Sequence, residues 1–569
     1  MSEHRQKVLV LGSDNRAFLA VVRSLGRRGI DVHVAWCARD STAICSKYVG
    51  TVHQLSRPPS NDWKSELKEL INRERYDLVI PCNDPSILPL HGEREYFKGL
   101  PIYLIDEAIF DTVMDKAAVN LIAAQIGIRL PRETVVSSAA EIDAIDALSA
   151  PYVLKPTRSY LENNLAQKNH VVICPNRSAA RGKLEQLLTS TPVAVQEYFE
   201  GRGVGVEFLA RDGQLMTAFQ HRRLHEPPDG GGSSYRKSCE LDEELLAATV
   251  MLIERLNYSG VGMAEFRYND AKRAWIFVEL NSRFWGSLPL AVNSGADFPS
   301  YLFDLCCENR MEFPRQYRVS RTCRNWALDV RWLQKTLLKN RWSLPKHLSL
   351  AFQLISELRY PLMLRESSDS FQWNDPAPAI KEITESLGSI PRRIGRKVSK
   401  VSSSIPALRT RSRKRLMRNV ANSKSVLFVC KGNICRSPFA ERYFRSKLQR
   451  IDNVSSSGYH PKLGRKSPEH AEAAAAEFDV DLTSHRSSIL SATAVEQADT
   501  IFVFDDENRR IVLTKYPNAR DKTFMLGLAL PHRDPEITDP YGGTVDAFRS
   551  IYLKIREAID CITKDQGIV

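Results

Sequence analysis

Residues 386–424 separate the chain into two parts with different sequence patterns. The segment holds twelve Lys and Arg residues and no Asp or Glu, and its apolar residues follow no helical or strand period. A segment with so few large apolar residues cannot bury enough surface to fold alone. We therefore predict a flexible basic linker, which carries +12 of the chain's net charge of +13.

The location of this charge limits the expected partners. Enzymes that act on nucleic acids more commonly spread positive charge over a folded surface, so we expect no specific nucleic-acid partner. A solvated tether is the simplest role for the linker. Attraction to anionic lipid, nucleic acid or an acidic polymer is the alternative.

The composition is that of a soluble globular protein, with 43% hydrophobic and 26% charged residues. The opening residues MSEHRQKVLVLGSD lack the features of a secretory signal, and no apolar run is long enough to cross a bilayer. The eleven cysteines are scattered and include no C-x-x-C pair, as expected in a reducing compartment. We therefore expect a cytoplasmic protein.

The part before the linker begins with alternating strand and helix patterns. Residues 8–12, 31–36 and 77–82 are typical of buried strands, and residues 18–29 have helical spacing that ends at a glycine. This alternation predicts a parallel sheet covered by helices over residues 1–115.

A second pattern covers residues 116–313. A helix-like segment at 116–127 leads to a strand at 152–156. Strand-like runs at 261–268 and 275–283 flank a short polar connector, which predicts a hairpin.

Two further domains complete the predicted organisation. Residues 314–385 predict a helical extension in which Trp326, Trp332 and Trp342 belong to the core rather than to a binding platform. Residues 425–566 predict a compact unit with its own strands and helices.

Oxygen-bearing side chains gather on the predicted hairpin. Glu265 lies on its first strand, and Glu279 and Asn281 lie two residues apart on the second, so that they share one face. Two carboxylates and an amide oxygen form a site suited to Mg²⁺. Arg283 follows two residues later on the same face, where it is placed to hold an anion.

The order of these features resembles ATP-grasp enzymes of the carboxylate–amine ligase type over residues 1–313. The resemblance lies in the segments DKAAVNLIAAQIGIRLP, YVLKP, VQEYFEGRGVGVEF and FVELNSRFWGS. It implies a pre-ATP-grasp α/β domain over residues 1–115 and α+β ATP-binding subdomains over residues 116–313.

The resemblance also implies roles for individual residues. Lys116 and Lys155 would contact the ATP phosphates as point charges. Arg283 would steady an acyl phosphate, formed from a substrate carboxylate and then attacked by an amine. The turn around Gly230 to Ser234 resembles a mobile lid. The Mg²⁺ ligands would be Glu265, Glu279 and Asn281, and the adenine would lie at Gln196, Glu197, Tyr198 and Phe199.

Departures from the ATP-grasp pattern leave alternatives open. The segment after Lys155, PTRSYLENN, lacks the glycines that usually cover the phosphates. Gly203 stands where a ribose-binding acid is expected, with Glu207 nearby. One alternative is a pseudoenzyme in which Glu279 and Asn281 are solvated strand-end residues. This part of the chain would then be a nucleotide-sensing or scaffolding module.

The part after the linker carries a pattern typical of a phosphate-binding nucleophile. An apolar strand, SVLFVC, ends at Cys430, the loop KGNICR follows, and Ser437 and Pro438 open a helix. Loop N–H groups and the helix N-terminus then converge on one point and favour the thiolate of Cys430. Arg436 is placed to grip two phosphate oxygens, and Gly432 permits the tight turn.

Hydrolysis of a phosphate ester also requires a proton donor for the leaving group. The segment ITDPYGG offers Asp539, which would act as general acid and then as base for the attacking water. Tyr541 would stack on an aromatic substrate.

These residues resemble the low-molecular-weight protein tyrosine phosphatase family. The match is V-C-x-G-N-x-C-R-S-P with D-P-Y downstream, supported by SSSGY, HRSS and FDDEN. The resemblance implies a doubly wound, four-stranded parallel sheet. Cys430 would be the nucleophile and form a phosphocysteine, Arg436 would bind phosphate, and Asp539 would be the acid. The phosphate loop would comprise Lys431, Gly432, Asn433, Ile434, Cys435 and Ser437.

The same resemblance assigns supporting roles within the loop. Asn433 and Ser437 would hold its shape, and Cys435 would form a reversible disulfide with Cys430 that protects it from overoxidation. Ile434 is similar to the residue of the tyrosine phosphatases, whereas threonine occupies that position in the arginine phosphatases.

Ser457 and Tyr459 depart from the family's usual Ala and Thr. They lie on a supporting strand, so they bear on specificity more than on activity. The sequence thus predicts a bifunctional enzyme, in which a phosphatase that needs no cofactor is tethered to an ATP- and Mg²⁺-dependent ligase.

The expected partners follow from these two activities. They are a phosphotyrosine protein, by analogy a tyrosine kinase controlling polysaccharide export, together with a small-molecule carboxylate and an amine. The alternatives are that the phosphatase alone is catalytic, or that the basic linker makes the protein a membrane- or polymer-bound scaffold.

Overall fold

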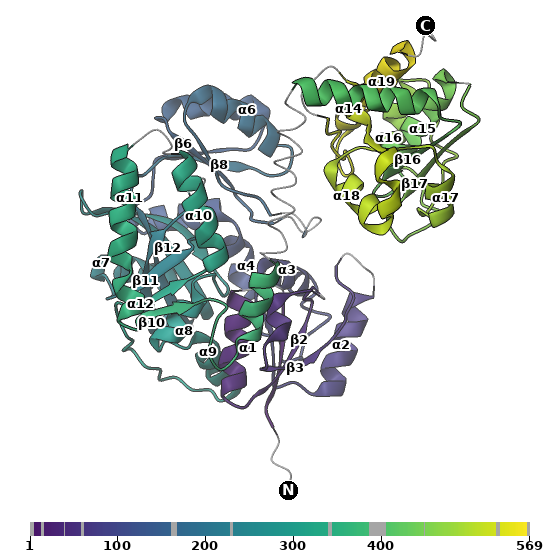
Figure 1. Ribbon diagram of the computed structural model, residues 1–569. Helices are drawn as coiled ribbons and strands as arrows, with labels where there is room; N and C mark the ends of the chain where they lie inside the picture. The colour runs from purple at the N-terminus through teal and green to yellow at the C-terminus, as the bar shows by residue number, and fades with distance from the viewer. Residues whose placement is uncertain are drawn as a thin grey trace. The chain divides into compact units, whose positions relative to one another are not determined.

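The computed structural model (Figure 1) forms two compact units, Met1–Ser386 and Leu387–Val569. Within the described residues, the first unit contains three sheets and the second contains one. No helix among these residues combines the length and the apolar character needed to span a membrane. The structure describes residues 5–12, 16–38, 40–58, 62–160, 165, 168–227, 232–339, 344–385, 406–448, 450–530 and 535–565.

A parallel sheet opens the first unit and confirms the predicted β/α alternation. Its elements are β1 (Lys7–Leu11), α1 (Ala17–Arg27), β2 (Asp31–Ala35), β3 (Val49–Val52), α2 (Trp63–Glu74), β4 (Leu78–Pro81) and α3 (Asp84–Gly92). The strand order is β3-β2-β1-β4, and every pair is parallel. Helix α1 ends just before Gly29, whose φ of +84° is the left-handed conformation that suits a glycine at a helix end.

A second sheet is antiparallel and has the strand order β5-β8-β6-β7. The elements of this region are α4 (Glu107–Met114), α5 (Lys116–Gln125), β5 (Glu133–Val136), β6 (Tyr152–Pro156), β7 (Val172–Cys174), α6 (Arg177–Leu187) and β8 (Val193–Glu197). Helix α6 packs its buried residues Ala180 and Leu184 against this sheet. The sheet places Lys155 on β6 next to the neighbouring strand β8, which carries Gln196.

The largest sheet has seven strands in the order β13-β12-β9-β10-β11-β14-β15. The elements of this region are β9 (Arg202–Arg211), β10 (Gln214–His225), β11 (Tyr235–Cys239), α7 (Glu243–Arg255), β12 (Gly260–Asn269), β13 (Ala274–Asn281), α8 (Leu288–Ser294), α9 (Phe298–Cys307), β14 (Thr322–Arg324) and β15 (Glu366–Ser368). The predicted hairpin is confirmed, because β12 and β13 pair antiparallel with Glu265 opposite Glu279.

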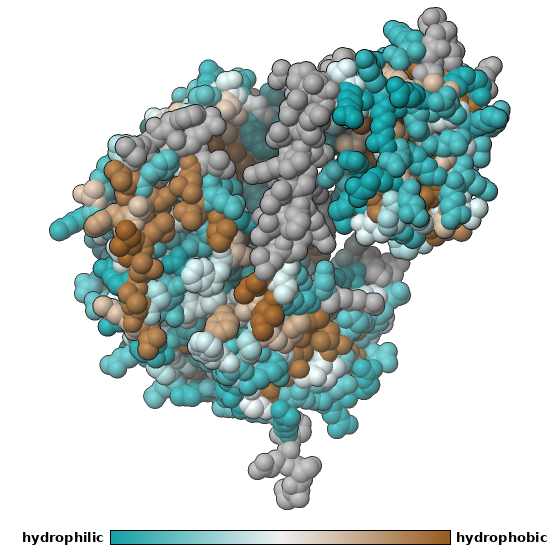
Figure 2. All heavy atoms as spheres, in the orientation of Figure 1, coloured by the Kyte–Doolittle hydropathy of each residue, from teal (hydrophilic) through white to brown (hydrophobic). Residues whose placement is uncertain are grey.

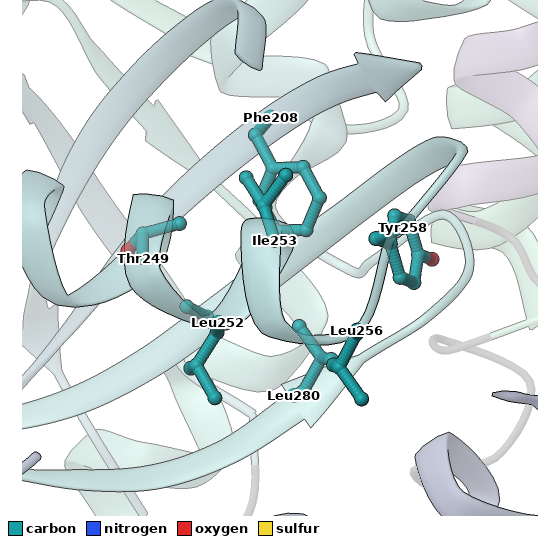
Figure 3. Close-up of a pocket in the computed structure, with 8 residues that line it drawn as sticks. Phe208, Thr249, Leu252, Ile253, Leu256, Tyr258 and Leu280 are labelled. Carbon is teal, nitrogen blue, oxygen red and sulfur yellow. The ribbon is translucent and has the colours of Figure 1, made fainter. Parts of the chain in front are cut away.

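Helix α7 packs its apolar face against this large sheet (Figure 3). Phe208 of β9 and Leu280 of β13 meet Leu252 and Ile253 of α7, and all four side chains are buried. The hydroxyl groups of Thr249 and Tyr258 donate to backbone carbonyls of the same unit. The small space among these residues is therefore packed core rather than a binding site.

Residues 314–385 differ from the predicted helical extension. They form the helices α10 (Trp326–Lys339), α11 (Leu344–Glu357) and α12 (Arg359–Leu362), but they also contribute β14 and β15 to the large sheet. Trp332 is buried as predicted, Trp326 is 56% exposed, and Trp342 lies outside the described residues. This region is therefore an integral part of the first unit.

A buried histidine fixes α10 and α11 to the large sheet. His225 contacts Asp329 of α10 at 2.7 Å through Nδ1 and Glu357 of α11 at 2.8 Å through Nε2. Its ring stacks on Trp332, with ring centroids 3.5 Å apart. Arg324 completes the group with an ion pair to Asp329. Removing one member of such a charged network destabilises the folded unit, because the charged groups that remain are still buried.

Replacing His225 with Ala is expected to lower the free energy of unfolding of the first unit by about 3–5 kcal/mol, because two buried carboxylates each lose one of their charged partners. Burial lowers the pKa of His225, but Asp329 and Glu357 raise it more, so that the net pKa is raised. The resulting stabilisation is complete below about pH 6.5 and is lost as the pH rises through the raised pKa.

Tryptophan fluorescence during urea unfolding measures this effect in the full chain. All eight tryptophans precede residue 387, so the signal reports on the first unit alone. The free energy of unfolding of the wild type should fall as the pH rises above about 6.5. The free energy of unfolding of the Ala variant should not show this decrease. A wild-type stability that rises over this pH range would contradict the role given to His225.

The second unit contains a doubly wound parallel sheet with the strand order β17-β16-β18-β19, as predicted. Its elements are α14 (Pro406–Ala421), β16 (Ser425–Cys430), α15 (Arg436–Lys447), β17 (Asn453–Gly458), α16 (Glu469–Ala476), α17 (Ala492–Gln497), β18 (Thr500–Val503), α18 (Asp506–Lys515), β19 (Thr523–Met525) and α19 (Val545–Asp565). Alternate residues of β16 face opposite sides. Phe428 packs in the core with α14, α15, α16 and α19, and Val429 packs in the core with α17 and α18.

Helix α14 corrects the prediction of a flexible linker over residues 386–424. Residues 386–405 lie outside the described residues, but residues 406–421 are helical. Leu416, Met417 and Val420 are buried in the core of the second unit. The many basic residues hide this short apolar stripe at helical spacing, which packs only because the unit supplies a partner surface.

Candidate functional site

The phosphate loop joins the carboxyl end of β16 to the start of α15. Cys430 is the last residue of β16, and α15 begins at Arg436. The backbone N–H of Asn433 donates to the Cys430 Sγ at 3.2 Å, and the Ser437 Oγ lies 3.0 Å from the same sulfur. The sulfur is therefore held at the helix N-terminus among groups able to stabilise negative charge.

Asn433 organises the loop from within. It adopts a left-handed φ of +50°, a conformation that asparagine tolerates better than most residues. Its Nδ2 donates to the Ser437 Oγ at 3.0 Å and to the Ser456 Oγ at 2.8 Å. Its Oδ1 accepts from the backbone N–H of Ser488 at 2.7 Å, and its carbonyl oxygen contacts His485 Nε2 at 2.7 Å. The loop is thus fixed to β17 and to the segment after α16.

Arg436 lies between two carboxylates. Its side chain is 1% exposed, and its Nη1 donates to Asp505 at 2.6 Å and to the carbonyl oxygen of Ile537 at 2.9 Å. Its Nη2 lies 2.9 Å from the Asp539 carboxylate. Burial lowers the pKa of Arg436, but Cys430 and the two carboxylates raise it more. The guanidinium is therefore permanently charged and oriented.

Two buried arginine nitrogens at the loop lack partners among the described residues. They are the Nε atoms of Arg436 and Arg465. Arg465 also donates from Nη2 to the Gly432 carbonyl oxygen at 2.6 Å, which places a second cation beside the loop. Buried donors without partners are costly, so an anion that accepted from these two cations at the loop would be stabilised there.

Asp539 and Tyr541 lie on the segment that precedes α19. The Asp539 side chain is 37% exposed and accepts weakly from the backbone N–H of Tyr541 at 3.4 Å. The Tyr541 side chain is 67% exposed. The structure thus brings Asp539 to Arg436 and leaves the Tyr541 ring exposed.

Cys435 lies behind the loop and is buried. Its carbonyl oxygen accepts from the Tyr552 hydroxyl at 3.2 Å. Burial raises the pKa of the Cys435 thiol, and the neighbouring Asp539 and Cys430 raise it further. Cys435 is therefore held as a neutral thiol, and its disulfide with Cys430 stays a prediction.

Strand β17 supplies a close contact that the sequence reasoning did not identify. A Cβ added to Gly458 would lie 2.8 Å from the Asn433 nitrogen and from the Lys431 carbonyl oxygen, so only glycine fits beside the loop. Next to it, Tyr459 accepts at 3.2 Å from Asn508 of α18. Burial raises the pKa of Tyr459 to about 12, so its hydroxyl stays neutral and supports the wall of the site.

The first unit gathers several predicted ATP-site residues at one pocket. Lys116, at the start of α5, forms an ion pair with Glu279 at 3.1 Å. Asn281 donates to Glu279 at 3.1 Å, and Arg283 pairs with Asp84 at 2.5 Å. All five residues line the same pocket, together with Arg158, Ser159 and Tyr160. Asp84, the first residue of α3, is a site residue that the sequence reasoning missed.

Glu279 is the electrostatic centre of this pocket. Burial raises its pKa, but the ammonium groups of Lys116 and Lys155 lower it more, so that the net pKa lies well below its usual range. Lys155 donates from Nζ to the Val278 carbonyl oxygen at 2.5 Å, and burial lowers its pKa. Glu265 lies opposite Glu279 in register and pairs with Arg223 at 2.6 Å.

The predicted adenine segment is largely engaged in internal bonds. The Gln196 side chain donates to Glu133 at 2.6 Å. The backbone N–H groups of Glu197 and Tyr198 donate to other backbone carbonyls of the unit. Phe199 is half-buried. An adenine contact at this segment would therefore rely on carbonyl oxygens or on the ring of Phe199.

Other predicted features lie apart from this pocket. Gly203 donates from its backbone to Glu226 at 3.4 Å, and Glu207 is fully buried, where it accepts from Ser287 at 2.8 Å. Glu207 is therefore closed off from a ribose. The proposed lid around Gly230 lies partly outside the described residues. Its described end is held where Ser234 donates to Asp329 at 2.6 Å.

Comparison with known proteins gives two family matches. The model of the low molecular weight phosphotyrosine protein phosphatases matches residues 425–565. The model described as ATP-grasp in the biosynthetic pathway with Ter operon matches residues 189–335.

Curated relatives match the second unit. Low molecular weight protein-tyrosine-phosphatase Etp of Escherichia coli (strain K12) is 35% identical over 134 residues, which is 24% of this chain and 88% of the relative. Protein-arginine-phosphatase of Bacillus subtilis (strain 168) is 31% identical over 142 residues, which is 24% of this chain and 94% of the relative. Probable low molecular weight protein-tyrosine-phosphatase AmsI of Erwinia amylovora is 34% identical over 128 residues, which is 22% of this chain and 87% of the relative.

The loop geometry and these comparisons both indicate a phosphatase of the low molecular weight type in the second unit. The relatives are covered almost completely, and their match lies within the unit that holds Cys430 and Arg436. Through its second unit the chain belongs to the low molecular weight phosphotyrosine protein phosphatase family, and its first unit carries an ATP-grasp domain.

Proposed function

We propose that the second unit hydrolyses phosphotyrosine in proteins through a phosphocysteine intermediate. The observation that carries this proposal is the Cys430 sulfur, held by the Asn433 N–H and the Ser437 hydroxyl beside the buried charge of Arg436. The unpartnered Nε donors of Arg436 and Arg465 support binding of a phosphate group at the same loop.

The proposed reaction has two steps. The Cys430 thiolate attacks phosphorus, the ester P–O bond breaks, and protonated Asp539 gives its proton to the leaving phenolate oxygen. Asp539 then takes a proton from water, whose oxygen attacks the phosphocysteine. Inorganic phosphate leaves and the thiolate is restored. Arg436 stabilises the charge on the transferring group in both steps.

The substrate preference is proposed to depend on Ile434. Replacing Ile434 with Thr is expected to raise the kcat/KM ratio of a phosphoarginine peptide over a phosphotyrosine peptide by about tenfold. Isoleucine offers an apolar surface to a phenyl ring, whereas threonine adds a hydrogen-bond acceptor for a guanidinium. Phosphate release from the two peptides by the full chain measures the ratio.

Replacement of Ile434 with Val is the matched control, because it removes one methylene without adding a hydroxyl. The valine variant should keep the wild-type ratio within about threefold. Wild-type hydrolysis of the phosphoarginine peptide alone would reverse the proposed preference. Hydrolysis of neither peptide in reducing buffer would contradict the phosphatase function itself.

We propose that the first unit is an ATP- and Mg²⁺-dependent carboxylate–amine ligase. Lys116 and Lys155 would bind the ATP phosphates, and a substrate carboxylate would attack the γ-phosphorus to give an acyl phosphate and ADP. An amine would then attack the acyl carbon and release phosphate. Arg283, aligned by Asp84, would hold the acyl phosphate during this exchange.

The proposed metal donors fit a magnesium ion in part. Glu279 is held ionised, Asn281 lies two residues further along the same strand, and Glu265 lies opposite Glu279 on the adjacent strand β12. Among the described residues no group of three His, Cys, Asp or Glu side chains could hold a metal alone. Mg²⁺ commonly takes one or two carboxylates together with phosphate oxygens, so this donor set suits a metal that arrives with the nucleotide. The bound ion would neutralise phosphate charge.

Replacing Glu279 with Gln is expected to weaken MgATP binding by about tenfold or more, because the variant lacks the ionised oxygen that holds the metal. Protection of the first unit against urea, followed by tryptophan fluorescence with and without MgATP, measures the affinity. Replacement of Glu254 with Gln, at an exposed position of α7, is the matched control and should not change it.

Two outcomes would change this proposal. Absence of MgATP protection in the wild type would contradict nucleotide binding. Protection without release of ADP in any mixture of carboxylates and amines would favour the alternative of a nucleotide-sensing module. We propose as partners a phosphotyrosine protein, such as a tyrosine kinase, and a small carboxylate with an amine.

A further inference from the structure

An exposed apolar face covers one side of the first unit. Figure 2 shows apolar side chains gathered over α10, α11 and α12. Soluble proteins rarely expose so many large apolar side chains together without a binding role. The apolar face comprises Trp326, Val330, Leu337, Leu348, Phe352, Ile355, Leu358, Leu362, Met363 and Leu364, each more than 40% exposed.

The spacing of these residues gives each helix one apolar side. On α11, Leu348, Phe352 and Ile355 follow one another at intervals of four and three residues, and Leu362 continues the row into α12. The opposite side of α11 packs against the interior of the unit, where Glu357 contacts His225. The apolar row therefore faces solvent and has no counterpart within the described part of the unit.

Leu364 is placed outward at a conformational cost. It adopts a left-handed φ of +54° at the turn after α12, where glycine or asparagine is usual. Its side chain is 83% exposed, so contacts within the unit do not offset this cost. The neighbouring Met363 is 60% exposed. The Leu364 side chain is therefore available for contact with a partner outside the unit.

The charge around the apolar face has one sign. Residues 326–365 contain seven Lys and Arg, but only two acidic residues, Asp329 and Glu357. Both acids are buried against His225. The solvent side of this region therefore presents apolar and basic groups without exposed carboxylates.

Arginines gather beside the outward turn. Arg321 donates from Nη1 to the Leu364 carbonyl oxygen at 2.7 Å. Burial lowers the pKa of Arg321, and the nearby Arg318 and Arg365 lower it further. None of these three arginines forms an ion pair with an acidic side chain that the structure describes. Such like charges, left together beside apolar side chains, are complementary to an anionic partner.

We propose that this apolar face docks on an anionic lipid bilayer. The apolar rows would enter the boundary between headgroups and acyl chains, and the flanking arginines would contact the lipid phosphates. Trp326, at the edge of the face, would lie at the headgroup level that tryptophan prefers. The proposal concerns the first unit and is independent of both proposed reactions.

Co-sedimentation of the full chain with vesicles tests the proposal. Wild type should bind vesicles of phosphatidylcholine with phosphatidylglycerol, and it should bind pure phosphatidylcholine vesicles much more weakly. The double replacement of Phe352 and Leu362 with Glu should lower the affinity by at least about tenfold. Leu463 of the second unit is 69% exposed, and its replacement with Glu is the matched control.

A second measurement locates the contact. Lipids that carry a quencher in the upper acyl chain should reduce tryptophan fluorescence of the bound protein, and replacement of Trp326 with Phe should remove part of that reduction. Urea unfolding of the double variant should match wild type, since Phe352 and Leu362 are exposed. This control separates loss of binding from loss of folding.

Three results would overturn the proposal. One is failure of wild type to bind the anionic vesicles. Another is binding that the Phe352 and Leu362 replacements leave unchanged, which would assign the attraction to other basic segments. The third is a dimer in sedimentation velocity that the same double variant dissociates, which would show that a second copy of the chain covers the face.

Discussion

Replacing Cys430 with Ser is expected to reduce hydrolysis of p-nitrophenyl phosphate by on the order of 10⁴-fold or more, at unchanged stability. A serine hydroxyl at this position stays protonated near neutral pH, so the phosphate would meet a far weaker nucleophile. The contacts that hold the sulfur, from Asn433 and Ser437, also suit an oxygen. The variant should therefore still bind phosphate analogues such as vanadate.

Rapid quenching during turnover shows whether the sulfur is the nucleophile. The wild type should accumulate a covalent phosphoryl group that peptide mapping places on Cys430, and the Cys430→Ser variant should accumulate none. Cys561, a half-buried thiol in α19, provides the matched control, and its replacement with Ser should leave turnover unchanged. Turnover by the Cys430→Ser variant within about tenfold of wild type would contradict a phosphocysteine mechanism.

The second large effect is expected when Asp539 is replaced with Asn. Loss of the general acid should reduce turnover of a phosphotyrosine peptide by about 10²–10⁴-fold. The loss should be smaller with p-nitrophenyl phosphate, because nitrophenolate is a better leaving group and needs a proton less. The ratio of the two losses is the signature of a missing acid.

A variant at Asp505 separates the loss of a carboxylate beside Arg436 from the loss of the proton donor. Asp505 and Asp539 each pair with Arg436, at 2.6 Å and 2.9 Å. Replacement of Asp505 with Asn removes a carboxylate from the same guanidinium but no proton donor. It should raise KM similarly for both substrates. If the Asp539 variant also loses activity equally on both substrates, its role is to position Arg436 rather than to protonate the leaving group.

Much of the fold follows from local sequence patterns. The buried runs that became β1, β2 and β4 predict a parallel sheet because they alternate with a helical pattern. The two strands around the connector at 270–273 pair as a hairpin for the same local reason. In each case the deciding information lies within a few residues of the element itself.

The errors occur where distant partners decide the structure. Strands β14 and β15 have three residues each and form only because the edge at β11 offers them a pairing surface. Local periodicity cannot reveal so short a strand, so residues 314–385 appear purely helical in sequence. Trp326 was expected in the core for the same reason, since its exposure depends on how α10 meets the sheet.

The phosphatase site also has one part that local sequence predicts and another part that depends on distant segments. Cys430, Arg436 and the residues between them are contiguous, so their motif predicts the loop directly. The residues that hold the loop come from other segments of the chain, and they include Asp505, Ser488 and Gly458. The segments FDDEN, HRSS and SSSGY that contain them support the family resemblance, but the contacts that each residue makes with the loop follow only from the tertiary fold.

The structure places the predicted ATP-grasp residues Glu279 and Asn281 at one pocket, together with counter-charges that the sequence did not reveal. Lys116 and Glu279 pair directly. Asp84 holds Arg283, although 199 residues separate them in the chain. That contact joins the start of α3 to the pocket, and only the tertiary fold could show it.

Helix α14 has a consequence for the order in which the second unit is made. Its apolar residues share one core with α19, and Arg413 of α14 lies 3.8 Å from Asp565 at the end of α19. During synthesis α14 leaves the ribosome first, and its covering helix leaves about 140 residues later, at rates of roughly 5–20 residues per second. For several seconds the nascent chain carries a complete phosphate loop that its core does not yet support. We therefore expect the phosphate loop to reach its final shape only when α19 closes the unit, after the ATP-grasp domain has been made.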